Sequence, residues 1–348
     1  MSTFRWTRLH TIAAAASGLV LVGSGVGLAV VLTGGEATPA ATASAGSSSA
    51  SATPARTTAT PTPNPRPTAT AAPVDPLTGG KPSGHRVFAV KIENIAAARP
   101  QVGLSAADIV FAEEVEGAQT RLIAVYHSSF PKRLGPVRSA RSTDVQLLPL
   151  FGRPGLVYSG ANSRVQRKID RASIVPIQRS TRDFRRVAPH NVFVNLSSIA
   201  ASAKVGKVRP IGWAFDAGDA RWKSAGAAAK PSAKVGHDTF AFDYSNGRYT
   251  VRWNGRTYLD GDSGAVSRTD NVVVMRVHNH GDGNRDVNGV PSVQSDTVGQ
   301  GSVIVYRDGK LVTGSWRRTS VSGPLHLLDG SGKDIALRPG KTWVVLSG

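Results

Sequence analysis

The sequence predicts an α+β fold, in which an N-terminal mixed α/β domain is followed by a β-rich C-terminal domain. In the first half, runs that alternate apolar and polar residues, such as 86–93, are interspersed with helix-like segments such as 164–172. In the second half, strand-like runs follow one another, and Asn-Gly dipeptides at 246–247 and 254–255 separate them. Asn-Gly between alternating runs is the strongest short signal for a β-hairpin.

The individual elements follow from these patterns in chain order. In the first half, the alternation predicts strands at 86–93, 109–115 and 120–128, with a turn or short helix at 105–108. Helices are expected at 144–151, 164–172 and 196–203, the first with Leu147, Leu148 and Phe151 on one face. Later strands are expected at 240–244, 248–253, 256–258, 271–277, 301–306, 310–316 and 342–346. An Asp-Gly dipeptide at 308–309 predicts one further hairpin.

Residues 1–33 are predicted to form a membrane anchor or signal segment. An uncharged apolar run, 12–32, follows Arg5 and Arg8, and a helix of this length spans about 30 Å, enough to cross a bilayer core. Because a cleaved signal has a shorter apolar region, of about 7–15 residues, an uncleaved anchor is favoured over a secreted product. The arginines before the run predict a single-pass protein of the cell membrane with its C-terminus outside.

Composition divides the remainder of the chain. Residues 34–80 are rich in Ala, Thr, Pro and Ser and are expected to form a disordered linker. The mixed α/β domain is expected at 81–222, a second linker at 223–235 and the β-rich domain at 236–348.

Charge and cysteine content narrow the class of partner. Residues 81–348 carry 38 Lys and Arg against 21 Asp and Glu, a net charge of +17 that attracts polyanions. Outside the membrane these are anionic cell-wall polymers and envelope components, and no nucleic acid is expected. The chain has no cysteine, which excludes disulfides and thiolate chemistry.

No cofactor and no metal site are expected. The segment 278–289 is rich in Asn and Asp but places Arg285 inside a calcium-like pattern and Ser295 where a bidentate Glu belongs. A polar loop between strands is the preferred interpretation. His278 and His280 alone are too few ligands to indicate a zinc site.

Short strings in a fixed order indicate a family. They are ARPQ at 98–101, VEG at 115–117, GPVRSAR at 135–141, PHN at 189–191 and PGKTW at 339–343. Together they resemble the YerB-like bacterial lipoprotein family over roughly residues 84–348. The resemblance implies an envelope-anchored protein with a mixed domain and a β-rich domain, and it implies no catalytic assignment. The chain departs from the family in lacking a lipobox cysteine and in having Ala118 where the usual string is Glu-Gly-Gly.

Polar residues gathered at the ends of the expected strands form the candidate ligand-binding set. Arginine presents a planar fork that suits carboxylate or phosphate, so a pocket of arginines would bind an anionic group. The alternative is a buried network in which Glu116 and Asp144 pair with arginines to organise the fold. The candidate ligand-binding residues are Arg99, Gln101, Glu116, Thr120, Arg121, Arg138, Ser139, Arg141, Asp144, His190 and Asn191.

Three functions follow from these observations. The leading one is binding of an anionic cell-wall component or an envelope protein through 135–141. The second is a cell-wall polymer hydrolase with Glu114 or Glu116 and His190 as candidate acid and base, because two carboxylates are what glycoside cleavage needs. Glu114 and Glu116 are expected on one strand face. The third is a scaffold for an envelope complex.

Overall fold

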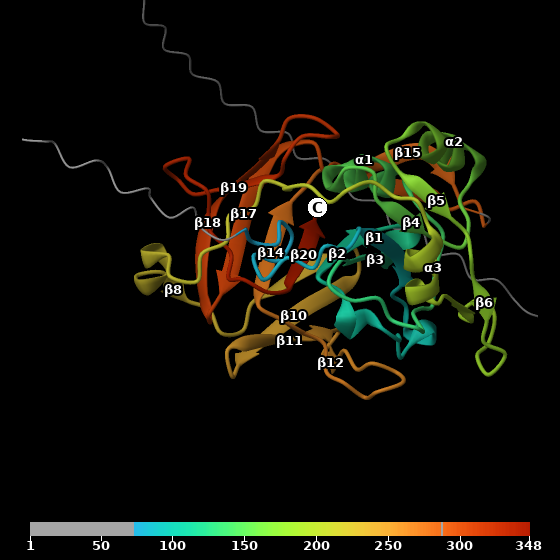
Figure 1. Cartoon of the computed structure of the whole chain (residues 1–348), viewed down its shortest axis with the longest axis horizontal. Helices are drawn as coiled ribbons and strands as arrows, with labels where there is room; N and C mark the ends of the chain where they lie inside the picture. The colour runs from blue at the N-terminus through green and yellow to red at the C-terminus, as the bar shows by residue number, and fades with distance from the viewer. Residues whose placement is uncertain (1–72, 287) are drawn as a thin grey trace, which may run out of the picture. The chain divides into compact units, whose positions relative to one another are not determined.

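The C-terminal strand joins the two halves of the chain in one sheet. The computed structural model describes residues 73–286 and 288–348. In it, β20 (Thr342–Ser347) lies between β14 (Asn271–Arg276) and β2 (Ile109–Glu114) and is parallel to both (Figure 1). Because β2 comes from the first half and β14 from the second, the predicted domains share a single hydrogen-bonded layer.

The large sheet has 11 strands within the described residues. Its order, from edge to edge, is β19 (His326–Leu328), β18 (Lys310–Arg318), β17 (Gly299–Arg307), β14, β20, β2, β3 (Thr120–Tyr126), β1 (Phe88–Glu93), β4 (Gly155–Val157) and β5 (Val175–Ile177), with β8 (Gly226–Ala227) paired to β18.

A smaller sheet and two short hairpins complete the strands. The smaller sheet contains β12 (Arg256–Thr257), β11 (Arg248–Trp253), β10 (Asp238–Ser245) and β9 (Ser232–Val235), with β13 (Arg268–Thr269) paired to β11. The hairpins are β6 (Thr181–Arg182) with β7 (Val192–Phe193), and β15 (Asn279–Arg285) with β16 (Pro291–Ser295).

The helices are short and capped by side chains. Asn162 and Asn195 accept the backbone N–H of Val165 and Ser198, at 2.8 and 2.9 Å, and so begin α2 and α3. The α-helices are α1 (Ser142–Leu147), α2 (Ser163–Arg171) and α3 (Leu196–Ser202). The 3-10 turns are η1 (Ala96–Ala98), η2 (Leu104–Ala106), η3 (Glu116–Ala118), η4 (Leu148–Phe151) and η5 (Ala220–Lys223).

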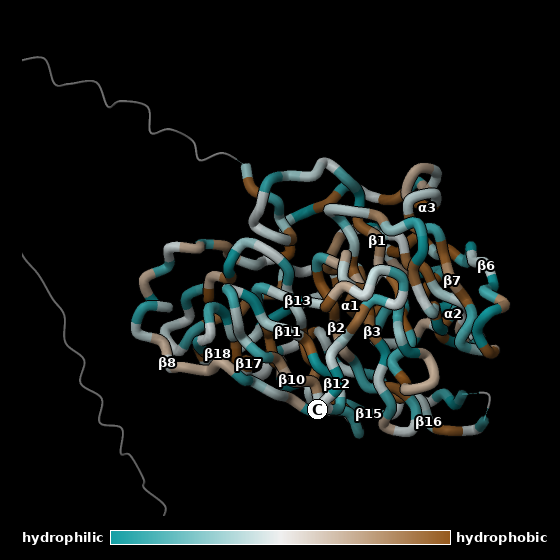
Figure 2. Tube along the Cα trace, turned by 90° about the horizontal axis from the view of Figure 1, so that it is seen from below, coloured by the Kyte–Doolittle hydropathy of each residue, from teal (hydrophilic) through white to brown (hydrophobic). Residues whose placement is uncertain are grey.

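The large sheet is buried on both faces. One face carries the cluster that includes Leu148, Phe151 and Ile169, contributed by η4 and α2. The other face carries Trp343, which packs against Phe240 and Phe242 of the smaller sheet. Figure 2 shows the corresponding apolar stretches along β1, β2 and β3 in the interior. A strand that is buried on both faces has a continuous apolar sequence and no alternation, as in β20 (TWVVLS).

The predicted hairpins are confirmed. Asn246-Gly247, Asn254-Gly255 and Asp308-Gly309 all have positive φ at both residues, the requirement of a tight type I′ turn. They connect β10 to β11, β11 to β12 and β17 to β18, as the sequence indicates.

Mixed secondary structure is confirmed, but the N-terminal half is dominated by sheet and is not an even α/β mixture. The expected helix at 144–151 is the six-residue α1 followed by the 3-10 turn η4, which contains Pro149, because proline has no N–H to continue the α-helix. The short strands β4 and β5 escaped prediction because three residues carry no measurable period.

Three expected irregular segments contain ordered structure. The segment 223–235 holds β8 and β9, each paired at a sheet edge. At the end of the expected disordered linker, Leu77 is fully buried. The expected polar loop at 278–289 contains β15, whose polar, glycine-rich sequence has no alternating apolar residues. Backbone pairing with β16 makes this segment a strand although its sequence lacks the alternation of apolar residues.

The predicted anchor at 12–32 and most of the predicted linker lie outside the described residues. Within 73–286 and 288–348, no helix has both the length and the apolar character needed to cross a membrane.

A buried ion triad connects β1, β2 and α1. The Lys91 ammonium donates to both carboxylate oxygens of Asp144 at 2.8 Å and to Oε1 of Glu113, and all three side chains are fully buried. Burial raises the pKa of Glu113 to about 7; Lys91 opposes the rise and Asp144 adds to it. The carboxylate form of Glu113 is therefore disfavoured in the folded protein.

We expect Glu113→Gln to remove a pH dependence of stability. The folded-state pKa of Glu113 lies above the unfolded value, so unfolding releases a proton between pH 4.5 and about 7. The free energy of unfolding of the native chain should thus fall by up to about 3 kcal/mol from this group as pH rises from 5 to 8. Urea unfolding at several pH values measures this dependence. If the free energy of unfolding changed with pH equally in the native and variant chains, the prediction would be contradicted.

Candidate functional site

A row of charged residues crosses one face of the large sheet. In the β1–β3 and β3–β2 registers, Arg121 lies opposite Glu93 on one side and Glu113 on the other. Lys91 shares that face with Glu93, because side chains two residues apart on a strand point the same way. The row borders the apolar cluster of Leu148 and Phe151, so these charges are largely removed from water.

The segment 135–141 crosses the charged row and places two further arginines. The Arg138 N–H donates to the Lys91 carbonyl at 2.9 Å, and its own carbonyl accepts from Ser159 N–H at 3.1 Å. The Ala140 N–H donates to Gly160 at 2.9 Å. Val137 and Ala140 are fully buried, so the polar residues between and after them face the site.

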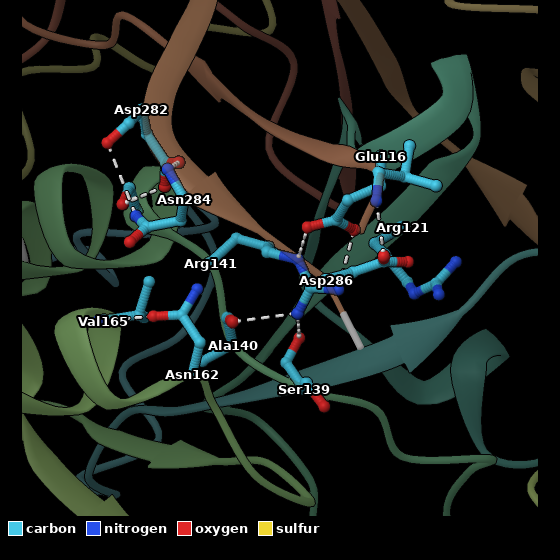
Figure 3. A network of polar contacts seen from close by, with 12 residues as sticks. Glu116, Arg121, Ser139, Ala140, Arg141, Asn162, Val165, Asp282, Asn284 and Asp286 are labelled. Atoms are coloured by element: carbon cyan, nitrogen blue, oxygen red, sulfur yellow. Dashed lines mark hydrogen bonds and ion pairs between the residues drawn. The ribbon is translucent and has the colours of Figure 1, made fainter. Parts of the chain in front are cut away.

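These elements enclose a pocket of about 550 Å³ (Figure 3). One wall is η3 with β3, another is the 135–141 segment and the α2 cap, and a third is the tip of the β15–β16 hairpin. The lining includes Glu116, Arg121, Arg138, Ser139, Arg141, Asn162, Arg285, Asp286 and Asn288.

Arg141 and Glu116 form a bidentate ion pair in this pocket. Arg141 Nε and Nη2 donate to the two oxygens of Glu116 at 2.5 and 2.7 Å, and Nη1 donates to the Ser139 and Ala140 carbonyls (Figure 3). Burial by itself would raise the pKa of Glu116, but the hydrogen bonds and charge of Arg141 outweigh it, so the pKa lies below its ordinary value. Glu116 is therefore an anion at neutral pH.

Arg138 is paired as well. Its Nε lies 3.0 Å from Oε1 of Glu93, a fully buried carboxylate whose other oxygen is 2.9 Å from Nδ1 of His190. Glu93 thus joins the pocket to the loop that carries His190.

Arg121 differs from its neighbours because it has no acidic partner at ion-pair distance among the described residues. Its side chain is only 6% exposed, yet its guanidinium makes one hydrogen bond, from Nη1 to the Thr120 carbonyl at 3.2 Å, and the buried Nε has none. The carboxylates opposite it, Glu93 and Glu113, are engaged by Arg138, His190 and Lys91. Burial lowers the pKa of Arg121 to about 10, a sign that its charge is poorly compensated.

Five residues of the predicted ligand-binding set therefore meet at the pocket, and the others lie outside it. Arg99 stacks on Trp253 and Tyr258, at 3.9 and 4.2 Å from the ring centroids, and donates to Asn94. Gln101 donates to the Glu93 carbonyl at 2.9 Å.

Three further members of the set take structural partners. Thr120 donates to Asp238 of the smaller sheet, Asp144 binds Lys91, and Asn191 accepts from Arg182 at 3.3 Å. The Thr120 contact joins the two sheets, the Asp144 contact joins α1 to the large sheet, and the Asn191 contact lies at the β6–β7 hairpin.

The candidate acid and base do not form one constellation. Glu114 ends β2 and accepts from Asn279 at 2.9 Å, whereas Glu116 lies in η3 and pairs with Arg141. The expectation that both share a strand face is wrong, because the strand ends before Glu116. His190 contacts Glu93.

Sequence reasoning missed the residues that close the pocket. Asn162 was not considered, although its position before an amphipathic run is a cap signal. Arg285 and Asn288 lie in the segment that was interpreted as a loop, and only the β15–β16 pairing brings them to the pocket.

Comparison with known proteins places the chain in a family. Models described as the N-terminal and C-terminal domains of a protein of unknown function (DUF3048) match residues 77–209 and 227–344. The Bacillus subtilis (strain 168) protein YerB, a lipoprotein candidate, is 27% identical over 293 residues, covering 77% of this chain and 84% of YerB. The chain belongs to the YerB-like family.

The fold of this family member agrees with a solved structure. The crystal structure of YerB from Bacillus subtilis matches with a TM-score of 0.66 at 23% identity, covering 79% of this chain and 96% of that one. The resemblance that rested on GPVRSAR and the accompanying strings is confirmed. The YerB-like family has no assigned activity, so the pocket geometry is the basis for a function.

We expect Arg121→Met and Arg141→Met to shift stability in opposite directions. The change at Arg121 would remove a buried charge without a close partner and should raise the free energy of unfolding by about 1–3 kcal/mol. The change at Arg141 would leave Glu116 unpaired and should lower it by about 2–4 kcal/mol. Chemical denaturation of both variants measures the two shifts. A loss of stability for Arg121→Met equal to that for Arg141→Met would show that Arg121 is a structural residue.

Proposed function

We propose that this chain is an extracytoplasmic binding protein whose pocket takes an anionic group, phosphate or carboxylate, of a cell-wall polymer. Arg121 carries the proposal. A buried guanidinium that has no acidic partner among the described residues, at the wall of a cavity, presents donors that a ligand or water can satisfy.

The charge balance of the pocket supports an anionic ligand. Four arginines line it, at positions 121, 138, 141 and 285, against the carboxylates of Glu116 and Asp286. Both carboxylates are engaged, Glu116 by Arg141 and Asp286 by the backbone N–H groups of Asn288 and Val290, each at 2.9 Å. The pocket therefore offers positive charge and free donors together.

The compartment rests on three observations. The apolar run at 12–32 has the length and flanking charge of an outward-facing anchor. A relative, YerB, is a lipoprotein candidate. The net charge of +17 on residues 81–348 favours polyanions, of which wall polymers are the abundant class outside the membrane.

The hydrolase alternative has less support from the geometry. A general acid for glycoside cleavage needs a raised pKa, whereas Arg141 holds the pKa of Glu116 below its ordinary value. Glu114, Glu116 and His190 each have a different partner. No observation favours a scaffold over a binding pocket.

We expect the Arg121→Gln/Arg285→Ala double variant to bind cell walls at least about tenfold more weakly than the native chain. The full chain, purified in a mild detergent, is mixed with purified bacterial walls at increasing salt, pelleted and quantified. These two arginines are chosen because neither leaves a buried carboxylate unpaired. The same assay is repeated with walls from which phosphodiester-linked polymers have been removed. Loss of binding to these walls indicates a phosphate ligand, and retained binding indicates a carboxylate ligand.

A charge-matched control tests whether the pocket or the overall charge is responsible. Arg256→Ala/Arg268→Ala also removes two positive charges, at exposed positions of the smaller sheet outside the pocket. Equal loss in both double variants, or no loss in the pocket variant, would overturn the proposal. Release of soluble wall fragments by the native chain would favour the hydrolase.

A further inference from the structure

A second cluster of polar side chains lies at the base of the β15–β16 hairpin, apart from the pocket. His278 directly precedes β15, His280 is the second residue of that strand, and Asp296 directly follows β16. The Asp296 N–H donates to the His278 carbonyl at 2.9 Å, which fixes the two strand ends against each other. The imidazole rings stack with their centroids 5.3 Å apart and 20° between their planes.

The three side chains converge on one point. His278 Nδ1 lies 3.2 Å from Oδ2 of Asp296, and His280 Nε2 lies 3.1 Å from Oδ1 of the same carboxylate. One ligating atom from each residue falls within 4.8 Å of the other two. This spacing suits a single ion bound by all three, since metal–nitrogen and metal–oxygen bonds of about 2.0–2.2 Å place neighbouring ligand atoms roughly 3–3.5 Å apart.

Both ring nitrogens of His280 lie close to oxygen acceptors. Nδ1 is 3.1 Å from the Gly281 carbonyl, an acceptor, so the ring proton belongs on Nδ1. In the neutral ring, Nε2 then presents a lone pair to a carboxylate oxygen. Two acceptors at this distance repel each other unless a proton or a metal ion lies between them. A backbone carbonyl that fixes one imidazole nitrogen is also the usual support of a metal-binding histidine.

We propose that His278, His280 and Asp296 bind one divalent transition-metal ion of the Zn²⁺ class. Two imidazole nitrogens and one carboxylate oxygen suit Zn²⁺, Ni²⁺ or Cu²⁺, whereas Mg²⁺ and Ca²⁺ take sites made of oxygen ligands. The His278 side chain is 76% exposed, so a fourth position faces solvent and takes water or an external ligand. The sequence offered only the two histidines, because Asp296 is brought to them by the hairpin register.

The site lies on the hairpin that completes the pocket. Ser295, which precedes the ligand Asp296, donates its N–H to Thr143 Oγ1 of α1 at 3.0 Å. The tip of the same hairpin carries Arg285 and Asp286 to the pocket. The metal proposal does not depend on what the pocket binds.

Isothermal titration of Zn²⁺ into the full chain tests the site. The chain is prepared without an affinity tag, treated with a chelator and kept in detergent with excess Mg²⁺, so that oxygen-only sites are already filled. We expect one Zn²⁺ per chain, and His278→Ala and His280→Ala should each weaken binding by at least about tenfold. Visible absorption of the Co²⁺-loaded chain gives a second readout, because its intensity and position report the ligand set directly.

A matched histidine provides the control. His326 also pairs with an aspartate, with Nδ1 3.1 Å from Oδ1 of Asp334, but has no third ligand beside it within the described residues. His326→Ala should leave Zn²⁺ binding unchanged. Circular dichroism without metal establishes whether each variant is folded. If His280→Ala does not fold, the milder substitution His280→Gln takes its place. Absence of saturable binding to the native chain, or equal binding by all the variants, would overturn the proposal.

Discussion

Lys91 is the buried cation on which the geometry of the arginine pocket depends. Its ammonium binds Glu113 of β2, a strand of the same sheet, and Asp144 of α1, and all three are removed from water. Asp144 also accepts the N–H of Arg141, the N-cap residue, at 2.6 Å, as the third residue of a capping box at the start of α1. A charge inside the core thus determines where α1 begins, and thereby where the Arg141 side chain leaves the backbone. A buried ion pair adds little net stability, but it specifies one arrangement.

The arginines around this triad fall into two kinds. Arg138 and Arg141 each have a carboxylate partner. Removal of Arg141 would leave Glu116 without its cation, whereas Glu93 would keep His190 if Arg138 were removed. Arg121 lies between acids that other cations already engage, and its burial lowers its pKa. Buried groups with perturbed pKa values cluster at functional sites, and structural ion networks contain them as well. The sequence left open a binding pocket and a purely structural ion network; Arg141 has the partner that a structural network requires, and Arg121 is the residue on which the proposed binding pocket rests.

The shared sheet explains why the YerB-like chain needs both of its family segments. β20 pairs with β2 and β14, so neither half completes its sheet alone. The pocket has the same dependence, since β3 and the 135–141 segment come from one half and the β15–β16 hairpin from the other. Both features arise from contacts between segments that are far apart in the sequence.

The elements with a strong local signal could be predicted from the amino-acid sequence. Three hairpins with Asn-Gly or Asp-Gly, the strands β1 to β3 and the helix α2 follow from turn chemistry and hydrophobic period, and GPVRSAR indicated the family. Tertiary structure alone decided which polar residues meet. Nothing in the sequence was a reason to treat Arg99 and Arg121 differently, yet Arg99 stacks on two aromatic rings and Arg121 lines a cavity. Local pattern specifies which face of a strand a side chain occupies, but its partners come from strand order and register, which depend on contacts distant in sequence.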